Sequence, residues 1–403
     1  MLNKNKEREL AYLVQIDDIK PIPGRDRVEC AIVGGWTIMI QKNQFKPGDI
    51  GIYFEIDSKV PEKEPFLFLA KKHYKIKTQK YKTPEGQFWS QGLLMHPNDF
   101  GWEVNEEEII DDKYNTYYVD NESRFLTKKL NVTYAVASDN KRKNKSVDKY
   151  QKMAQRHKKK FSKQPYRWLM QRKWGKKLLF IFFGKKKDKR AWPDWVKKTD
   201  EERVQNMPWI LDSKESWIVT EKIDGTSTTF TIKRKLLGGY DFYVCSRNVV
   251  FEKPNQPCFY DSNVYLEMAQ KYDIKNKMIA MMNRFPDCEW ITIQGETYGE
   301  GVQKRDYSLK EHKFMAFNLI NSVQGRLNTW VMKQILQDWY DIPCVPILET
   351  KYYLPKTIKE LLNYATGEST IDGLPREGIV LRTWDGVQSF KVVSNEYLMK
   401  YHN

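Results

Sequence analysis

The sequence predicts an α+β protein in which an N-terminal β-barrel precedes a domain of antiparallel sheets with flanking helices. Short β-rich runs separated by turn signals fill residues 11–99, which suits a small barrel. From Trp192 onward, strand patterns mix with helical periodicity, as in α+β domains. A lysine-rich stretch lies between these two regions. The 403 residues exceed the usual size of one hydrophobic core, so several domains are expected.

The first predicted domain spans residues 1–110. Its apolar runs include Ala11-Tyr-Leu-Val-Gln-Ile, Trp36-Thr-Ile-Met-Ile and Gly51-Ile-Tyr-Phe-Glu-Ile. About five closely spaced strands favour an OB-type β-barrel, a fold that often binds nucleic acid, although an SH3-like barrel would show a similar pattern. Lysines and aromatics interleave over residues 71–82, as in a strand that contacts a nucleic-acid backbone; a solvated edge strand would look similar.

The predicted connecting segment, residues 111–190, carries the basic excess of the chain. The formal charge is +16, but residues 141–190 alone sum to +19 and the rest to −3. A local excess of this kind favours a polyanion-binding element. Residues 141–163 predict a polar helix or a disordered stretch, whereas residues 166–183 mix aromatics with cations and predict a helix or hairpin. The alternative to a nucleic-acid clamp is a solvated tether with a hydrophobic docking patch.

The third predicted domain spans residues 191–403. Helical periodicity appears over residues 264–274 and 327–340. The strand candidates are residues 216–220, 230–232, 243–245, 290–294, 314–317, 378–382 and 390–393. Strands and helices in this mixed order predict antiparallel sheets with flanking helices.

The candidate chemistry begins at Glu221-Lys-Ile-Asp-Gly, directly after an apolar strand. A lysine there can act as a nucleophile only if neighbouring cations or a divalent metal lower its pKa from about 10.4. The pattern K-x-D-G alone also occurs in ordinary turns. Five further groups follow in order: Ser246-Arg-Asn, Ile293-Gln-Gly-Glu-Thr-Tyr-Gly, Lys313-Phe-Met-Ala-Phe-Asn, Arg376-Glu-Gly-Ile-Val-Leu-Arg and Ser389-Phe-Lys-Val-Val.

This array resembles motifs I, Ia, III, IIIa, IV and V of the covalent nucleotidyltransferase superfamily of polynucleotide ligases and mRNA capping enzymes. The resemblance extends to ATP-dependent RNA ligases in which an OB domain precedes the nucleotidyltransferase domain. The segments that carry it are Pro21-Ile-Pro-Gly-Arg-Asp-Arg-Val-Glu, Phe54-Glu-Ile-Asp-Ser, Ser90-Gln-Gly-Leu and Lys198-Thr-Asp-Glu-Glu-Arg-Val-Gln-Asn. It does not account for the lysine-rich stretch.

The resemblance implies that the chain forms a lysyl-AMP intermediate from ATP with Mg²⁺ or Mn²⁺, adenylylates a 5′-phosphate and joins it to a 3′-hydroxyl. The implied partner is RNA, or an RNA-containing duplex with a nick, in RNA repair. The alternatives are a capping-type guanylyltransferase, a DNA ligase and a catalytically silent nucleic-acid-binding protein. We expect a cytoplasmic monomer without a membrane span, because the chain shows no long apolar run and its five scattered cysteines predict reduced thiols.

The resemblance also implies roles for individual residues. Lys222 carries AMP, Asp224 shapes its loop, Glu377 engages the catalytic metal and Lys391 stabilises charge on the α-phosphate. The residues implied to contact the nucleotide are Glu221 and Phe317 at adenine, Arg247 at phosphate or ribose, Glu296 at ribose, Gly225 in the loop and Lys391. Considered in isolation, Phe317 would be interpreted as a core residue. The two acids, Glu296 and Glu377, would be interpreted as solvated strand ends.

Two features depart from the family pattern. Val393 stands where related ligases often have a second motif V lysine, which leaves Lys391 as the assigned cation and Lys400 as a speculative substitute. Twelve residues follow Lys391, so we expect neither the C-terminal OB domain nor motif VI of DNA ligases and capping enzymes. Other groups must then orient pyrophosphate.

Overall fold

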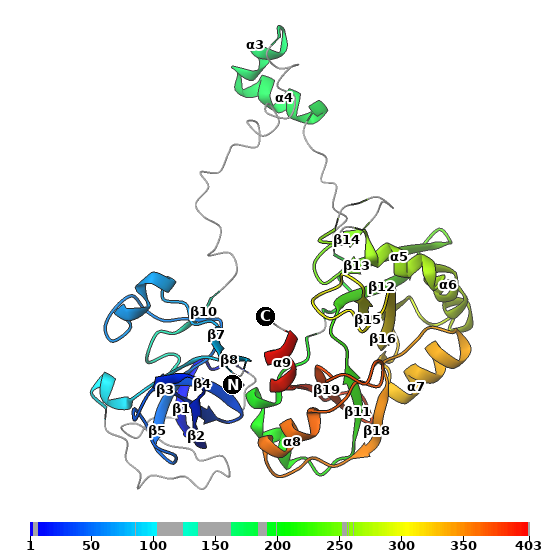
Figure 1. Ribbon diagram of the computed structural model, residues 1–403. Helices are drawn as coiled ribbons and strands as arrows, with labels where there is room; N and C mark the ends of the chain where they lie inside the picture. The colour runs from blue at the N-terminus through cyan, green and yellow to red at the C-terminus, as the bar shows by residue number, and fades with distance from the viewer. Residues whose placement is uncertain are drawn as a thin grey trace. The chain divides into compact units, whose positions relative to one another are not determined.

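The structure is a computed structural model that describes residues 1–2, 7–84, 86–102, 124–135, 163–183, 192–198, 200–251, 256, 258–260 and 262–401. The chain divides into two compact units (Figure 1). One comprises residues 1–135 and 193–403, and the other comprises residues 136–192. The predicted polar stretch 141–162 lies outside the described residues.

The N-terminal strands form antiparallel sheets in the orders β1–β5–β9 and β2–β3–β4, with β6 paired to β10 and β7 paired to β8. Alternate side chains enter the core: on β4, Trp36, Ile38 and Ile40 are buried while the residues between them are not. The strands are β1 (Ala11–Gln15), β2 (Asp18–Ile22), β3 (Arg25–Val33), β4 (Trp36–Gln41), β5 (Ile50–Phe54), β6 (Ser58–Lys59), β7 (Gln79–Thr83), β8 (Gly86–Ser90), β9 (Leu93–Met95) and β10 (Thr133–Tyr134). This is the predicted OB-type barrel.

The strand expected over residues 71–82 is wrong in its first half. A 3₁₀ helix, η1 (Leu67–Lys72), occupies that part of the chain, and a second, η2 (Pro97–Phe100), follows β9. His73 and Tyr74 come directly after η1 with φ of 53° and 56°. A left-handed pair interrupts an extended strand, so the pairing of β7 with β8 begins only at Gln79.

The core of the N-terminal domain extends beyond residue 110. Leu126, Leu130 and Val132 are buried in the same cluster as Leu10 and Ile52. The Thr127 hydroxyl accepts a hydrogen bond from the Leu10 amide at 2.8 Å. Residues 124–135 therefore pack with the barrel, although they lie in the predicted connecting segment. The domain boundaries expected at residues 110 and 190 stay predictions.

The C-terminal domain contains a six-stranded sheet, in the order β14–β13–β12–β15–β16–β17, and a four-stranded sheet, in the order β18–β11–β19–β20. All strand pairs in both are antiparallel. The strands are β11 (Trp217–Lys222), β12 (Thr226–Arg234), β13 (Tyr240–Ser246), β14 (Val250–Phe251), β15 (Trp290–Gly299), β16 (His312–Asn321), β17 (Gly325–Arg326), β18 (Ile347–Tyr352), β19 (Gly378–Thr383) and β20 (Ser389–Val393). The predicted α+β class and antiparallel sheets are confirmed.

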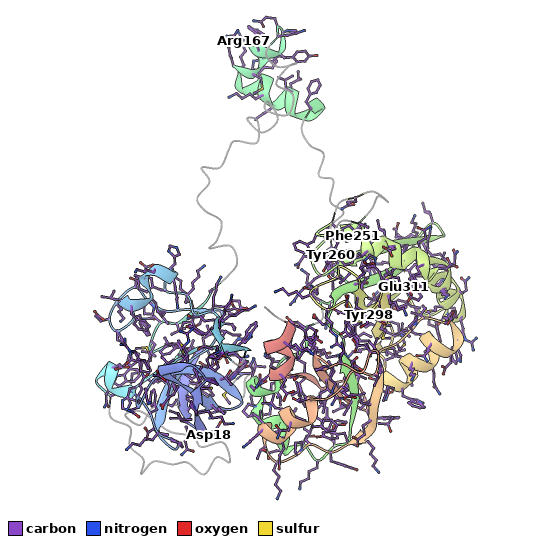
Figure 2. All side chains as sticks on the ribbon, in the orientation of Figure 1. Asp18, Arg167, Phe251, Tyr260, Tyr298 and Glu311 are labelled. Atoms are coloured by element: carbon purple, nitrogen blue, oxygen red, sulfur yellow. The ribbon has the colours of Figure 1, made fainter. Side chains whose placement is uncertain are left out.

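Helices cover these sheets with apolar side chains. Met268, Met278 and Met332 pack with the core of the six-stranded sheet, whereas Leu361 and Ala365 pack with that of the four-stranded sheet. The helices are η5 (Val204–Asn206), η6 (Pro208–Asp212), α5 (Val264–Lys271), α6 (Ile274–Arg284), α7 (Thr329–Lys333), η7 (Gln334–Trp339), α8 (Ile358–Ala365) and α9 (Asn395–Tyr401). Figure 2 shows Tyr298, a fully buried side chain of β15, within this domain.

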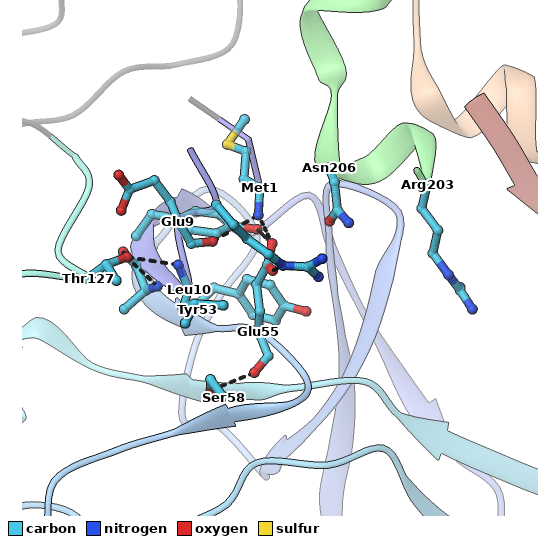
Figure 3. Close-up of polar contacts among 12 residues, drawn as sticks. Met1, Glu9, Leu10, Tyr53, Glu55, Ser58, Thr127, Arg203 and Asn206 are labelled. Carbon is cyan, nitrogen blue, oxygen red and sulfur yellow. Dashed lines mark hydrogen bonds and ion pairs between the residues drawn. The ribbon is translucent and has the colours of Figure 1, made fainter. Parts of the chain in front are cut away.

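A polar cluster surrounds Glu55 in the barrel (Figure 3). Glu55 is buried, and it accepts hydrogen bonds from the Tyr12 hydroxyl at 3.2 Å and from Arg8 at 3.1 Å. The Leu2 amide donates to the Asn206 carbonyl at 2.9 Å. This bond and an ion pair between Arg8 and Glu202 at 3.8 Å link the barrel to residues 200–206, and Asp200 and Glu201 of that segment line the candidate site.

The second unit is a pair of short helices, α3 (Tyr166–Met170) and α4 (Lys173–Phe183). Leu179 is its buried centre, and Tyr166, Leu169, Met170 and Phe183 pack against it. The helix or hairpin predicted over residues 166–183 is therefore a helical pair. Across the described part of the chain, none of the helices has the length and apolar character needed to cross a membrane.

Candidate active site

A cavity of about 310 Å³ opens between the two sheets of the C-terminal domain. Side chains from β11, β12, β15, β16, β19 and β20 line it. The predicted site residues in its lining are Glu221, Lys222, Gly225, Arg247, Glu296, Phe317 and Lys391. The other two, Asp224 and Glu377, contact this set directly or through its loop. The structure thus gathers all nine predicted residues in one region.

Lys222 lies at the end of β11, opposite Gly378 at the start of β19. Its ammonium donates to the Glu377 carboxylate at 2.6 Å. Gly378 has φ of +153°, and a Cβ there would lie 2.1 Å from the Val392 carbonyl oxygen. Only glycine allows β19 to approach β20 this closely, and the residue before it, Glu377, is thereby held beside Lys222.

The carboxylates around Lys222 control its charge. Burial lowers the pKa of Lys222, but Glu377, Glu296 and Asp224 outweigh burial and leave this pKa above its ordinary value. Burial also raises the pKa of Glu296 to about 8, against the opposing effect of Lys222. The amine is therefore held as an ammonium at neutral pH, and positive charge bound beside its acids would lower its pKa.

These acids suit a hard divalent cation. Among the described residues, no group of three or more His, Cys, Asp or Glu side chains is arranged to hold a metal by itself. Mg²⁺ and Mn²⁺ need no such group, because they favour oxygen ligands, and Mg²⁺ is commonly held by one or two carboxylates together with waters and substrate phosphates. Glu377, whose carboxylate lies 2.6 Å from the Lys222 ammonium, provides such a ligand.

Two tyrosines that the sequence analysis did not identify hold the loop after Lys222. The Tyr397 hydroxyl of α9 donates to the Asp224 carboxylate at 2.8 Å, and the Asp224 amide donates to the Tyr307 hydroxyl at 2.7 Å. The buried guanidinium of Arg305 lies 4.1 Å from the Tyr307 ring centroid and 5.4 Å from that of Tyr397. Gly225 continues the loop, where a Cβ would lie 2.3 Å from the Thr297 carbonyl oxygen.

Glu221 is buried at the far side of the same strand end. Its carboxylate accepts hydrogen bonds from the Thr370 amide at 2.9 Å, from the Thr370 hydroxyl at 2.7 Å and from the Ser369 hydroxyl. These bonds fasten the loop at residues 369–370 to β11. The expected contact between Glu221 and adenine stays a prediction. For that contact, adenine would have to bind a carboxylate that already accepts hydrogen bonds from Ser369 and Thr370.

The cations at the other end of the cavity share one acid, Asp200. Lys391 donates to Asp200 at 2.9 Å, and Arg247 pairs with the second oxygen of the same carboxylate. Burial raises the pKa of Asp200, but the two cations outweigh it and lower this pKa. Asp200 was quoted only as part of a family-like segment. Its proximity to Lys391, 191 positions later, follows from the fold.

Arg382 is a further cation that sequence reasoning missed. It is almost fully buried, lines the cavity and pairs with Glu201 at 3.1 Å. Among the described residues, its Nε and Nη1 atoms have no hydrogen-bond partner. Val393 is buried, and Lys400 is exposed and does not line the cavity. Arg382 is therefore better placed than Lys400 to supplement Lys391.

Comparisons with known proteins match each of the two domains to a family model. A family model described as RNA ligase matches residues 215–401, and an OB-fold domain model matches residues 10–95. No curated protein matches the chain.

Solved structures of one RNA ligase are also similar to the chain. Naegleria gruberi RNA ligase with PPi is 25% identical with a TM-score of 0.59, over 98% of this chain and 99% of that one. A mutant of it with ATP and Mn is 25% identical with a TM-score of 0.59, over 98% and 100%. Another mutant, with AMP and Mn, is 24% identical with a TM-score of 0.60, over 98% and 99%.

Replacing Tyr397 by phenylalanine should destabilise the C-terminal domain. The change leaves the buried Asp224 carboxylate without the hydroxyl at 2.8 Å, which should cost about 1–3 kcal/mol of unfolding free energy. Chemical denaturation monitored by tryptophan fluorescence measures this loss. Tyr401→Phe on the same helix is the control and should change stability by less than about 0.5 kcal/mol. Equal effects of the two substitutions would argue against the Tyr397 contact.

Replacing Glu377 by glutamine should make Lys222 more reactive in metal-free protein. The substitution removes the acid that raises the pKa of Lys222, and each unit of pKa lost increases the neutral fraction of the amine about tenfold at pH below that pKa. Acylation by an amine-reactive reagent, resolved by peptide mass spectrometry, measures the rate at Lys222. Lys271, which pairs with Glu311 at 2.8 Å elsewhere, should be labelled equally in both proteins. A rate at Lys222 that is unchanged or lower contradicts the expectation.

Proposed function

We propose that Lys222 carries AMP and that the enzyme seals a 5′-phosphate to a 3′-hydroxyl. The chain belongs to the RNA ligase family through residues 215–401, and this membership supports the proposal. One observation supports this most directly: Lys222 lines the cavity between the two sheets, and its ammonium lies 2.6 Å from the Glu377 carboxylate. A strand-end lysine held by an acid that can accept a divalent metal has the elements of an activated nucleophile.

In the first step, the Lys222 amine attacks the α-phosphorus of ATP. An N–P bond forms, the bond from that phosphorus to the bridging oxygen breaks, and pyrophosphate leaves with the electron pair. Bound at Glu377, Mg²⁺ or Mn²⁺ would offset the carboxylate charge beside the amine and so lower the pKa of Lys222. ATP and Mn are the ligands named for the Naegleria relatives, which supports the same donor and metal type here.

The cations of the cavity are suited to the phosphates of ATP. Lys391 and Arg247 share Asp200 in the ligand-free protein, and that carboxylate is largely exposed. A phosphate that displaces Asp200 would meet both cations at once, with Arg382 nearby as a buried third. Phe317 lines the same cavity from β16 and offers an aromatic ring to a base. We assign adenine stacking to Phe317 and a ribose contact to Glu296.

In the second and third steps, AMP passes from Lys222 to the 5′-phosphate of a polynucleotide, and the 3′-hydroxyl attacks that phosphate with release of AMP. All three steps are phosphoryl transfers, so positioning and charge stabilisation supply most of the acceleration. We assign as substrate a nick with RNA at the 3′-hydroxyl side, and an RNA repair role follows. The OB-fold domain is a second nucleic-acid surface on the same chain.

Three alternatives remain distinguishable by experiment. A capping-type guanylyltransferase would form its adduct with GTP in preference to ATP, and a DNA ligase would seal nicks with DNA at the 3′-hydroxyl. A silent binding protein would bind RNA without exchanging pyrophosphate into ATP. The last is disfavoured by the grouping of Lys222, Glu296, Glu377 and Lys391 around one cavity, because a protein without chemistry has no need of all four.

Lys222→Ala should abolish formation of the covalent adduct. After incubation of wild-type protein with α-labelled ATP and Mg²⁺, label should remain on the denatured protein, whereas the variant should show only background. Lys235→Ala removes an exposed lysine of the same domain, paired with Asp241 at 3.3 Å, and should label like wild type. Labelling of Lys222→Ala equal to that of wild type would exclude Lys222 as the nucleophile.

Sealing should depend on the sugar at the 3′-hydroxyl side of the nick. We expect duplexes with an RNA 3′-hydroxyl strand to be joined, and the same duplexes with a DNA 3′-hydroxyl strand to accumulate adenylylated 5′ ends. Product analysis of nicked duplexes in every RNA and DNA combination measures both species. Equal sealing of the two kinds of end contradicts the assigned RNA requirement without affecting the assignment of Lys222.

A further inference from the structure

The helical pair of residues 163–183 exposes two tryptophans that its own core does not use. Leu179 and four partly buried neighbours form that core, and neither Trp168 nor Trp174 is among them. Trp168 is 41% exposed and Trp174 is 53% exposed. Their rings meet edge to face, with centroids 5.8 Å apart and an interplanar angle of 82°. Adjoining exposed apolar side chains, unlike single scattered ones, are a feature of interaction sites.

Arg172 completes this surface. Its guanidinium carbon lies 4.0 Å from the centroid of the Trp168 ring, within cation–π distance. We call Trp168, Arg172 and Trp174 the tryptophan face. The arrangement presents a flat guanidinium and an exposed indole side by side, and both kinds of group stack on planar ligands.

The charge around the tryptophan face is of one sign. Residues 163–183 contain six Lys or Arg and no Asp or Glu. Arg167, which Figure 2 labels on α3, and Lys177 are exposed members of this set. With no acid in the described unit to neutralise them, these cations favour a polyanionic partner.

A partner that fits must therefore combine negative charge with exposed planar rings. Single-stranded RNA has both, because its phosphates attract cations and its unpaired bases stack on aromatic and guanidinium planes. Duplex RNA satisfies only the charge, since its base faces are covered. An anionic lipid surface satisfies charge and apolar character but offers no planar ring to stack.

We propose that the tryptophan face binds unpaired nucleotides of the RNA on which the ligase acts. This inference rests on the proposed function, because it takes RNA as the partner of the same chain. A second contact elsewhere on the same chain raises the local concentration of the substrate at the enzyme, so it increases affinity without any change in the chemistry at Lys222.

The test uses the full-length protein with both tryptophans replaced, Trp168→Ala with Trp174→Ala. Fluorescence anisotropy with a labelled single-stranded RNA should show a loss of affinity of about tenfold or more. The slope of log affinity against log salt should stay the same, because no cation has been removed. Arg172→Gln should weaken binding and also reduce that slope by about one.

A matched control removes exposed tryptophans elsewhere. Trp330 and Trp339 of the C-terminal domain are 43% and 52% exposed, and Arg284 lies 4.5 Å from the Trp339 ring centroid. Trp330→Ala with Trp339→Ala should leave RNA affinity unchanged. Trp168→Tyr with Trp174→Tyr keeps two aromatic rings and should retain most of the affinity, which separates stacking from a general loss of structure.

Three outcomes overturn the proposal. The first is wild-type RNA affinity in the double alanine variant, and the second is a double tyrosine variant that binds RNA as weakly as the double alanine variant. The third is a double alanine variant that keeps its RNA affinity but no longer binds phosphatidylglycerol vesicles. The last would identify the face as a membrane contact. Lys222 adenylylation should be normal in every variant. If wild-type protein forms no adduct while the tryptophan effects on RNA binding persist, the proposed ligase function fails and the RNA-binding face does not.

Discussion

The ion pair between Lys222 and Glu377 is the interaction on which the site depends. The acids Glu377, Glu296 and Asp224 stabilise the ammonium form of Lys222, so the pKa of this amine lies above its ordinary value. The same acids are what a divalent cation needs. Under the proposed function, positive charge must reach the carboxylates before the amine can lose its proton.

The fold holds this pair through close backbone contacts instead of long flexible side chains. The antiparallel pairing of β11 with β19 sets Lys222 opposite Gly378, and the absence of a side chain at Gly378 lets β19 lie against β20. From the other side, Tyr397 and Tyr307 hold both the carboxylate and the amide of Asp224. The loop that follows Lys222 is thus fixed at both of its ends.

Periodicity predicted the strands that carry the motifs, because their apolar alternation is strong and local. β11, β19 and β20 lie where apolar runs indicated them. α8 was missed although Thr357 and Glu360 form a capping box there, a signal that local reading of the sequence could have detected. The first half of the strand predicted over residues 71–82 failed because left-handed residues after η1 break extended structure without changing the pattern of residue types.

The site residues that lie within the sequence motifs were predictable from the sequence. Lys222, Glu296, Glu377 and Lys391 stand in ordered motifs, and the fold brings them to one cavity. Tyr397, Tyr307, Asp200 and Arg382 were not singled out, because their partners lie far away in sequence. Tyr397, for example, contacts a carboxylate 173 residues earlier. Such contacts depend on how two sheets and a terminal helix pack, which residue types and spacing do not encode locally.

The most direct test of this account is the pKa of the Lys222 amine with and without metal. Lysine-selective isotope labelling and NMR titration, with Lys222→Arg used to assign the signal, would give that value in both states. The account predicts a pKa above the ordinary lysine value in metal-free protein and a clear fall when Mg²⁺ binds. A pKa that is already low without metal, or one that metal leaves unchanged, would contradict it.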